Sequence, residues 1–82
     1  MKGGDAMRIG KNGKDALRIM GGNDGYLSDE ARIVRWITLA TMYALKRNGL
    51  VRHDAGDRHR LRFPAWHLTR AGWKAWKKVL AI

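Results

Sequence analysis

The chain has 82 residues, no cysteine and a formal net charge of +10. A chain of this size forms one small domain with a thin core, because it buries only about 60–65% of the surface that its unfolded form exposes. The lack of cysteine excludes disulfides and cysteine-based zinc sites and favours a cytoplasmic, nucleoid-associated location over a secreted one. No apolar run approaches the roughly 18–20 residues of a membrane span, so we expect no membrane association.

The positive charge is concentrated in the C-terminal part of the chain. Residues 1–30 hold five basic and five acidic side chains, whereas residues 31–82 hold twelve basic and two acidic ones. A basic half of a small domain attracts polyanions, and nucleic acid is the commonest of these. The alternative is a basic protein whose charge only keeps it in solution.

The beginning of the chain predicts an arm followed by a short helix. Residues 1–11 are rich in glycine and indicate a flexible arm, which leaves residues 12–82 as a single domain. Asn12 is a candidate N-cap for the first helix, and Gly21–Gly22 supplies a left-handed stop. A short strand-like segment is expected at Tyr26–Leu27.

Residues 28–48 contain neither glycine nor proline, so they predict either one long helix or two shorter ones. Ser28 is a candidate N-cap and Gly49 a candidate stop. A straight helix would be apolar nearly all round, because two apolar clusters lie on faces roughly 150° apart. We therefore favour two helices that meet near Ile37 and Thr38, with Thr38 capping the second. The first cluster comprises Ile33, Val34, Trp36 and Ile37, and the second comprises Leu39, Met42 and Leu45.

A basic hairpin is expected next. Leu50–Asp54 and Arg58–Trp66 predict two antiparallel strands joined by a tight connection, and Pro64 indicates an edge or a bulge in the second strand. Strict alternation in the second strand places three arginines on one side. These are Arg58, Arg60 and Arg62, and the other side holds His59, Leu61 and Phe63. Thr69 then caps a final helix.

Four tryptophans are available to build the core, and each can bury up to about 150–250 Å². We expect Trp36, Trp66 and one member of the pair Trp73 and Trp76 to be buried. The other member of that pair would face a partner. Because Trp73, Trp76 and Leu80 share one face of the final helix, they are the candidate contact of a homodimer.

The expected order of three helices, a two-stranded basic wing and a C-terminal helix resembles a winged helix-turn-helix domain, an α+β fold that is mostly helical. The stretch Leu45–Arg52 (LKRNGLVR), the basic hairpin and Leu68–Gly72 (LTRAG) are similar to the pattern in MarR-like and PadR-like bacterial regulators. The resemblance covers about residues 38–73. It implies that the third helix enters the major groove, that the wing contacts the backbone or minor groove, and that the final helix dimerises.

The candidate nucleic-acid contacts lie on the third helix and on the wing. Arg47 could pair bidentately with guanine, and Thr41 or Tyr43 could bind a base edge or a phosphate. The arginine side of the wing fits a phosphate rail or a minor groove, although charge on an exposed strand also prevents aggregation. The predicted nucleic-acid-binding residues are Thr41, Tyr43, Lys46, Arg47, Arg52, Arg58, Arg60 and Arg62.

The sequence lacks the motifs of the common enzyme classes. It contains no glycine-rich phosphate loop, nucleophile elbow or carboxylate pair, so we expect neither catalysis nor a cofactor. Three histidines, His53, His59 and His67, lie in this part of the chain, and His53 and His59 could lie opposite each other in the hairpin. The spacing of the three does not indicate a metal site. An amphipathic membrane-surface binder is less favoured, because the tryptophans of residues 70–82 are needed for the core.

The sequence therefore predicts a small basic winged-helix protein that binds nucleic acid, with double-stranded DNA favoured over RNA. The resemblance implies the role of a DNA-binding transcriptional regulator of bacterial or phage origin. The alternative is a phage-encoded inhibitor or accessory subunit, a non-enzymatic protein that docks on a protein partner within a nucleoprotein complex.

Overall fold

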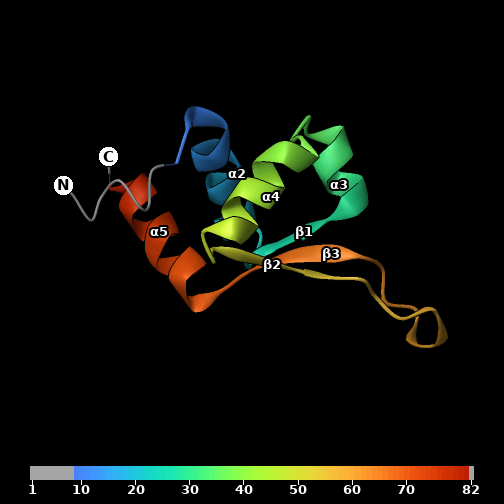
Figure 1. The fold of residues 1–82 in the computed structure, drawn as a ribbon. Helices are drawn as coiled ribbons and strands as arrows, with labels where there is room; N and C mark the ends of the chain where they lie inside the picture. The colour runs from blue at the N-terminus through green and yellow to red at the C-terminus, as the bar shows by residue number, and fades with distance from the viewer. Residues whose placement is uncertain (1–8, 82) are drawn as a thin grey trace.

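Four α-helices and a three-stranded antiparallel sheet form residues 9–81, the part of the chain that the computed structural model describes (Figure 1). This arrangement confirms the predicted α+β class. Most of the predicted arm, residues 1–8, and the last residue of the predicted domain lie outside the described residues. In chain order the elements are α2 (Lys11–Gly21), β1 (Tyr26–Ser28), α3 (Asp29–Val34), α4 (Leu39–Arg47), β2 (Val51–Asp54), the 3-10 turn η1 (Arg58–Arg60), β3 (Ala65–Leu68) and α5 (Arg70–Leu80).

The first helix ends at Gly21, as predicted, but its N-cap and the conformation of its stop need correction. The N-cap of α2 is Gly10 and not Asn12, and Gly10 makes no side-chain cap. The helix begins earlier than predicted, and Ile9, the residue before this N-cap, packs against the core. At the other end, Gly22 has φ −73° and is not left-handed. The left-handed residues come later, at Asp24–Gly25, with φ of 56° and 75°.

Residues 28–48 form two helices, as predicted. The Ser28 hydroxyl accepts the Ala31 N–H at 3.0 Å and begins α3, and the Thr38 hydroxyl accepts the Thr41 N–H at 3.2 Å and begins α4. Gly49 follows α4 with φ 75°, as a left-handed stop requires. The helical path is interrupted at Trp36, whose φ is 60°.

The prediction that Trp36 is a core residue is wrong, because 90% of its surface is exposed. Its neighbours Ile33 and Val34 are exposed as well, and no residue of α3 is buried. Of the first apolar cluster, only Ile37 enters the core. We attribute this to the left-handed conformation of Trp36, which turns the chain so that the following residue takes the inward position.

The sheet has the order β1-β3-β2, and both pairings are antiparallel. Val51 lies opposite Leu68, and Tyr26 lies opposite His67. Helices α2, α3 and α4 lie on one side of the sheet, and α5 lies beyond its end (Figure 1). The largest fully buried side chains, contributed by both helices and sheet, are Leu17, Met20, Leu27, Met42, Leu45, Leu50 and Trp66.

The predicted second strand of the hairpin, Arg58–Trp66, is wrong over most of its length. The paired strand β3 begins only at Ala65. The preceding residues 55–64 form a loop, here called the β2–β3 loop, which contains η1 and projects away from the helices (Figure 1). The alternation of arginines along a strand is therefore lost, since Arg58 and Arg60 lie in η1 and Arg62 forms only an isolated β-bridge with Asp57.

Local hydrogen bonds explain why this loop is not a strand. The Asp54 carboxylate accepts the Gly56 N–H at 2.8 Å, and the Asp57 carboxylate accepts the His59 N–H at 2.9 Å. Such turns compete with a strand ladder for the backbone. Leu61 is left-handed, with φ 55°, and Pro64 has no N–H to give to a ladder.

Candidate nucleic-acid interface

The predicted nucleic-acid-binding residues lie on α4, on β2 and on the β2–β3 loop. All of the basic ones are exposed, and so is Tyr43, whereas Thr41 is partly buried. Of the predicted residues on α4, the exposed ones are Tyr43, Lys46 and Arg47. On the strand and loop they are Arg52, Arg58, Arg60 and Arg62.

Helix α4 is oriented by two buried side chains. Met42 and Leu45 are buried as predicted, so Tyr43 and Arg47 lie on the exposed surface. The Tyr43 ring makes an edge-on contact with Trp66, with ring centroids 5.9 Å apart, and this contact restrains it. The Thr41 hydroxyl is 3.0 Å from the Thr38 hydroxyl at the helix start, so it is less available for a base edge than predicted.

Two arginines of the β2–β3 loop have acidic partners. A nitrogen of Arg62 lies 3.5 Å from a carboxylate oxygen of Asp54, and Arg60 Nε lies 3.8 Å from Asp57. Within residues 9–81, Arg52 and Arg58 form no ion pair. The loop therefore carries both ion-paired and unpaired arginines, and exposed pairs of this kind contribute only about 0–1 kcal/mol each.

Asp54, the last residue of β2, has a perturbed pKa. The hydrogen bond from the Gly56 N–H is the largest influence and lowers its pKa below the ordinary 3.8. Burial opposes this shift, and the positive charge of Arg62 adds a further lowering that is smaller than the effect of burial. Asp54 is therefore ionised at neutral pH and fixes the start of the loop.

The histidines do not gather into a metal site. His53 Nε2 is 3.1 Å from an Asp29 carboxylate oxygen, and the His53 ring centroid is 4.5 Å from that of Trp66. Trp66, and not His59, lies opposite His53 in the sheet. In the described part of the chain, no group of three histidine or acidic side chains is arranged to hold a metal ion.

The predicted dimer residues of α5 pack largely on their own chain. The Trp73 and Trp76 rings contact each other edge to face, with centroids 5.3 Å apart, and both pack against the core. A Cβ added at Gly21 or at Gly25 would overlap these rings, so the two glycines allow the close approach. Leu80 remains exposed.

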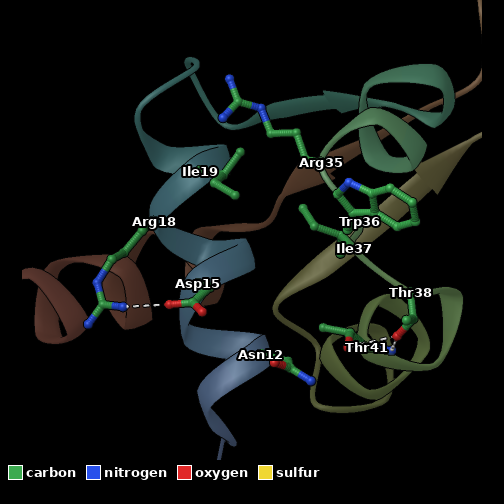
Figure 2. Close-up of a pocket in the computed structure, with 9 residues that line it drawn as sticks. All are labelled: Asn12, Asp15, Arg18, Ile19, Arg35, Trp36, Ile37, Thr38 and Thr41. Atoms are coloured by element: carbon green, nitrogen blue, oxygen red, sulfur yellow. Dashed lines mark hydrogen bonds and ion pairs between the residues drawn. The ribbon is translucent and has the colours of Figure 1, made fainter.

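A cleft of about 400 Å³ lies between α2 and the turn that joins α3 to α4 (Figure 2). Most of its polar side chains already have a partner within the cleft. A nitrogen of Arg18 is 2.9 Å from a carboxylate oxygen of Asp15, and the hydroxyls of Thr38 and Thr41 share a hydrogen bond. We find no pairing of a nucleophile with a base among its lining residues. These are Asn12, Asp15, Arg18, Ile19, Arg35, Trp36, Ile37, Thr38 and Thr41.

Sequence reasoning missed the exposed apolar side chains. Leu61 and Phe63 on the β2–β3 loop are 81% and 75% exposed. Ile33, Val34 and Trp36 form a second exposed group, here called the α3 cluster. Hydrophobicity alone favours burial of all five, and the only sequence signal against it was the density of charged neighbours.

The sequence matches no protein family, and no curated protein or solved structure is significantly similar to it. The resemblance to MarR-like and PadR-like regulators therefore stays a prediction. None of the helices between residues 9 and 81 combines the length and apolar character needed to cross a membrane.

Proposed function

We propose that the protein is a small winged-helix protein that binds double-stranded DNA at the nucleoid and regulates transcription in a bacterium or a phage. It has no enzymatic activity in this proposal. The observation that supports it is the exposure of every predicted basic contact residue, on one helix and on a projecting loop. The order of helices and strands is compatible with a winged-helix arrangement.

In this proposal α4 enters the major groove. Its nine residues span about 13–14 Å, and a single α-helix fits the major groove of B-form DNA. Arg47 reads a guanine, and Lys46 contacts a phosphate. The β2–β3 loop then contacts the adjacent backbone or minor groove through its arginines.

The proposal is tested by measuring the affinity for a DNA duplex by fluorescence anisotropy over a range of salt concentrations. The triple variant Arg58→Ala, Arg60→Ala, Arg62→Ala should reduce the slope of log K against log salt by about 3, because each phosphate contact contributes about 0.9. A matched control removes the same charge from exposed positions of α5, as Lys74→Ala, Lys77→Ala, Lys78→Ala. This control should change the slope less.

Two results would contradict the proposal. If both triple variants lose the same affinity and slope, only net charge matters and the loop is not a contact surface. If the wild-type protein does not bind a duplex at all, the proposed function is wrong. Single-stranded DNA and duplex RNA of equal length, titrated in parallel, test the preference for double-stranded DNA.

The α3 cluster supports a second candidate function, that of an accessory or inhibitor protein that docks on a protein partner. Ile33, Val34 and Trp36 are three large apolar side chains exposed within four residues of the chain, and exposed apolar side chains that gather on a small domain can mark an interaction site. A photo-crosslinking amino acid at position 36 should capture a protein partner in producing cells if this function holds. The same amino acid at Arg35, the adjacent exposed position, tests how far the contact extends.

A further inference from the structure

The β2–β3 loop presents two apolar side chains to solvent among its arginines. Leu61 and Phe63 are 81% and 75% exposed, and neither belongs to the core or packs against it. Arg60 and Arg62 flank them in the chain and are exposed too. We call Leu61 and Phe63 the wedge pair. In the free protein these two side chains therefore contribute little to stability through burial of apolar surface.

Hydrogen bonds and left-handed residues give the loop backbone next to the wedge pair a defined conformation. Asp57 and Arg62 exchange two backbone hydrogen bonds, both 2.9 Å long, which close the loop below its tip. Gly56 has φ 83°, and a Cβ at this position would overlap the Arg62 carbonyl oxygen. Leu61 adopts a left-handed conformation, which is sterically unfavourable for a leucine. The loop therefore holds an apolar side chain outward in a conformation that leucine disfavours.

The chemistry of this tip fits the minor groove of duplex DNA. The groove is only about 6 Å wide, so it admits a narrow loop, and its negative potential attracts arginine. Proteins that bend DNA from the minor groove insert apolar side chains such as Leu and Phe between base steps. Arg58 forms no ion pair within residues 9–81, which leaves its charge available to phosphates.

We propose that the wedge pair inserts between base pairs in the minor groove and bends the DNA, while the surrounding arginines hold the backbone. This proposal rests on the proposed function, because it requires binding to duplex DNA. It adds an architectural activity, in which the loop unstacks a base step and kinks the duplex.

The test measures bending separately from binding. A short duplex carries a donor and an acceptor dye at its ends, so that a bend raises the energy transfer at saturating protein. A second duplex carries 2-aminopurine, whose fluorescence rises when a base is unstacked. The double variant Leu61→Asn, Phe63→Ser removes the wedge, and asparagine tolerates the left-handed conformation that position 61 requires.

The wild-type protein should raise both signals, and the wedge variant should raise neither while keeping the salt slope of its binding. A variant with Arg58→Ala and Arg60→Ala is the matched control, and it should bind more weakly but still bend the duplex at saturation. Wild-type binding without bending, or an unchanged bend in the wedge variant, would overturn the wedge alone. Failure of the wild-type protein to bind any duplex would overturn the proposed function together with it.

Discussion

The contrast between two tryptophans gives the sharpest test of the fold. Trp66 is 2% exposed and is the largest fully buried side chain, whereas Trp36 is 90% exposed. The Trp66→Ala substitution should cost about 3–5 kcal/mol, because it leaves a cavity and removes the ring contacts with His53 and Tyr43. A domain of this size rarely has more than about 3–5 kcal/mol of stability. Trp66→Ala should therefore be largely unfolded.

The Trp36→Ala variant should change the free energy of unfolding by less than about 0.5 kcal/mol, as exposed positions usually do. Trp36→Gly should be more stable than Trp36→Ala by about 1 kcal/mol, because only glycine adopts φ 60° without a steric penalty. Urea denaturation followed by far-ultraviolet circular dichroism measures all three variants without relying on tryptophan fluorescence. A stable Trp66→Ala protein, or a loss of more than about 2 kcal/mol in Trp36→Ala, would refute the assignment of the core.

Two further predictions concern a helix contact and the loop. Gly72→Ala should destabilise the protein by about 2 kcal/mol or more, as measured by thermal denaturation, since the added Cβ would overlap the Leu50 carbonyl oxygen and the backbone there would have to move. The pKa of Asp54 is lowered chiefly by the Gly56 N–H and also by Arg62. The ionised carboxylate therefore stabilises the folded loop, and this contribution is fully present when the pH is above the ordinary pKa of 3.8. This contribution should be lost as the pH falls through the lowered pKa. An NMR titration of the Gly56 amide should show the transition, and Asp54→Asn, which keeps an acceptor oxygen, should abolish it.

The helix starts were predictable because their causes are local. Ser28, Thr38 and Thr69 each accept a backbone N–H three residues further on, at 3.0, 3.2 and 3.1 Å. A hydroxyl placed before an apolar-periodic segment is enough to indicate such a cap. The same local reasoning failed at Asn12, because the N-cap of α2 is Gly10, which has no side chain to indicate a helix start.

The β2–β3 loop was not predictable from periodicity. Alternating arginines between Arg58 and Arg62 have the pattern of a strand, but two aspartate turns and a left-handed Leu61 decide the conformation. The exposure of the arginines could be predicted from their charge. Their pairing with Asp54 and Asp57 could not, because it depends on how the loop closes.

Few of the predicted contact residues could hydrogen-bond to a base, which raises the question of how the protein would recognise a DNA sequence. In the proposed function Arg47 would be the strongest base contact of α4, and one bidentate contact discriminates by about 1–3 kcal/mol, well short of the 4–10 kcal/mol typical of an operator. A homodimer would double the contacts on an inverted repeat. The predicted dimer contact through Trp73, Trp76 and Leu80 stays a prediction, although both tryptophan rings already pack on their own chain.

Bending supplies discrimination from a different source. The energy needed to kink a duplex depends on its sequence, and pyrimidine–purine steps are the easiest to deform. A wedge at Leu61 and Phe63 would therefore select flexible steps without any hydrogen bond to a base. In the proposed function Arg47 would read little sequence directly, and Thr41 already bonds to Thr38. Selection by deformability would then require fewer contacts than selection by a second copy of α4. The proposed wedge would allow a single small domain to prefer some DNA sites over others.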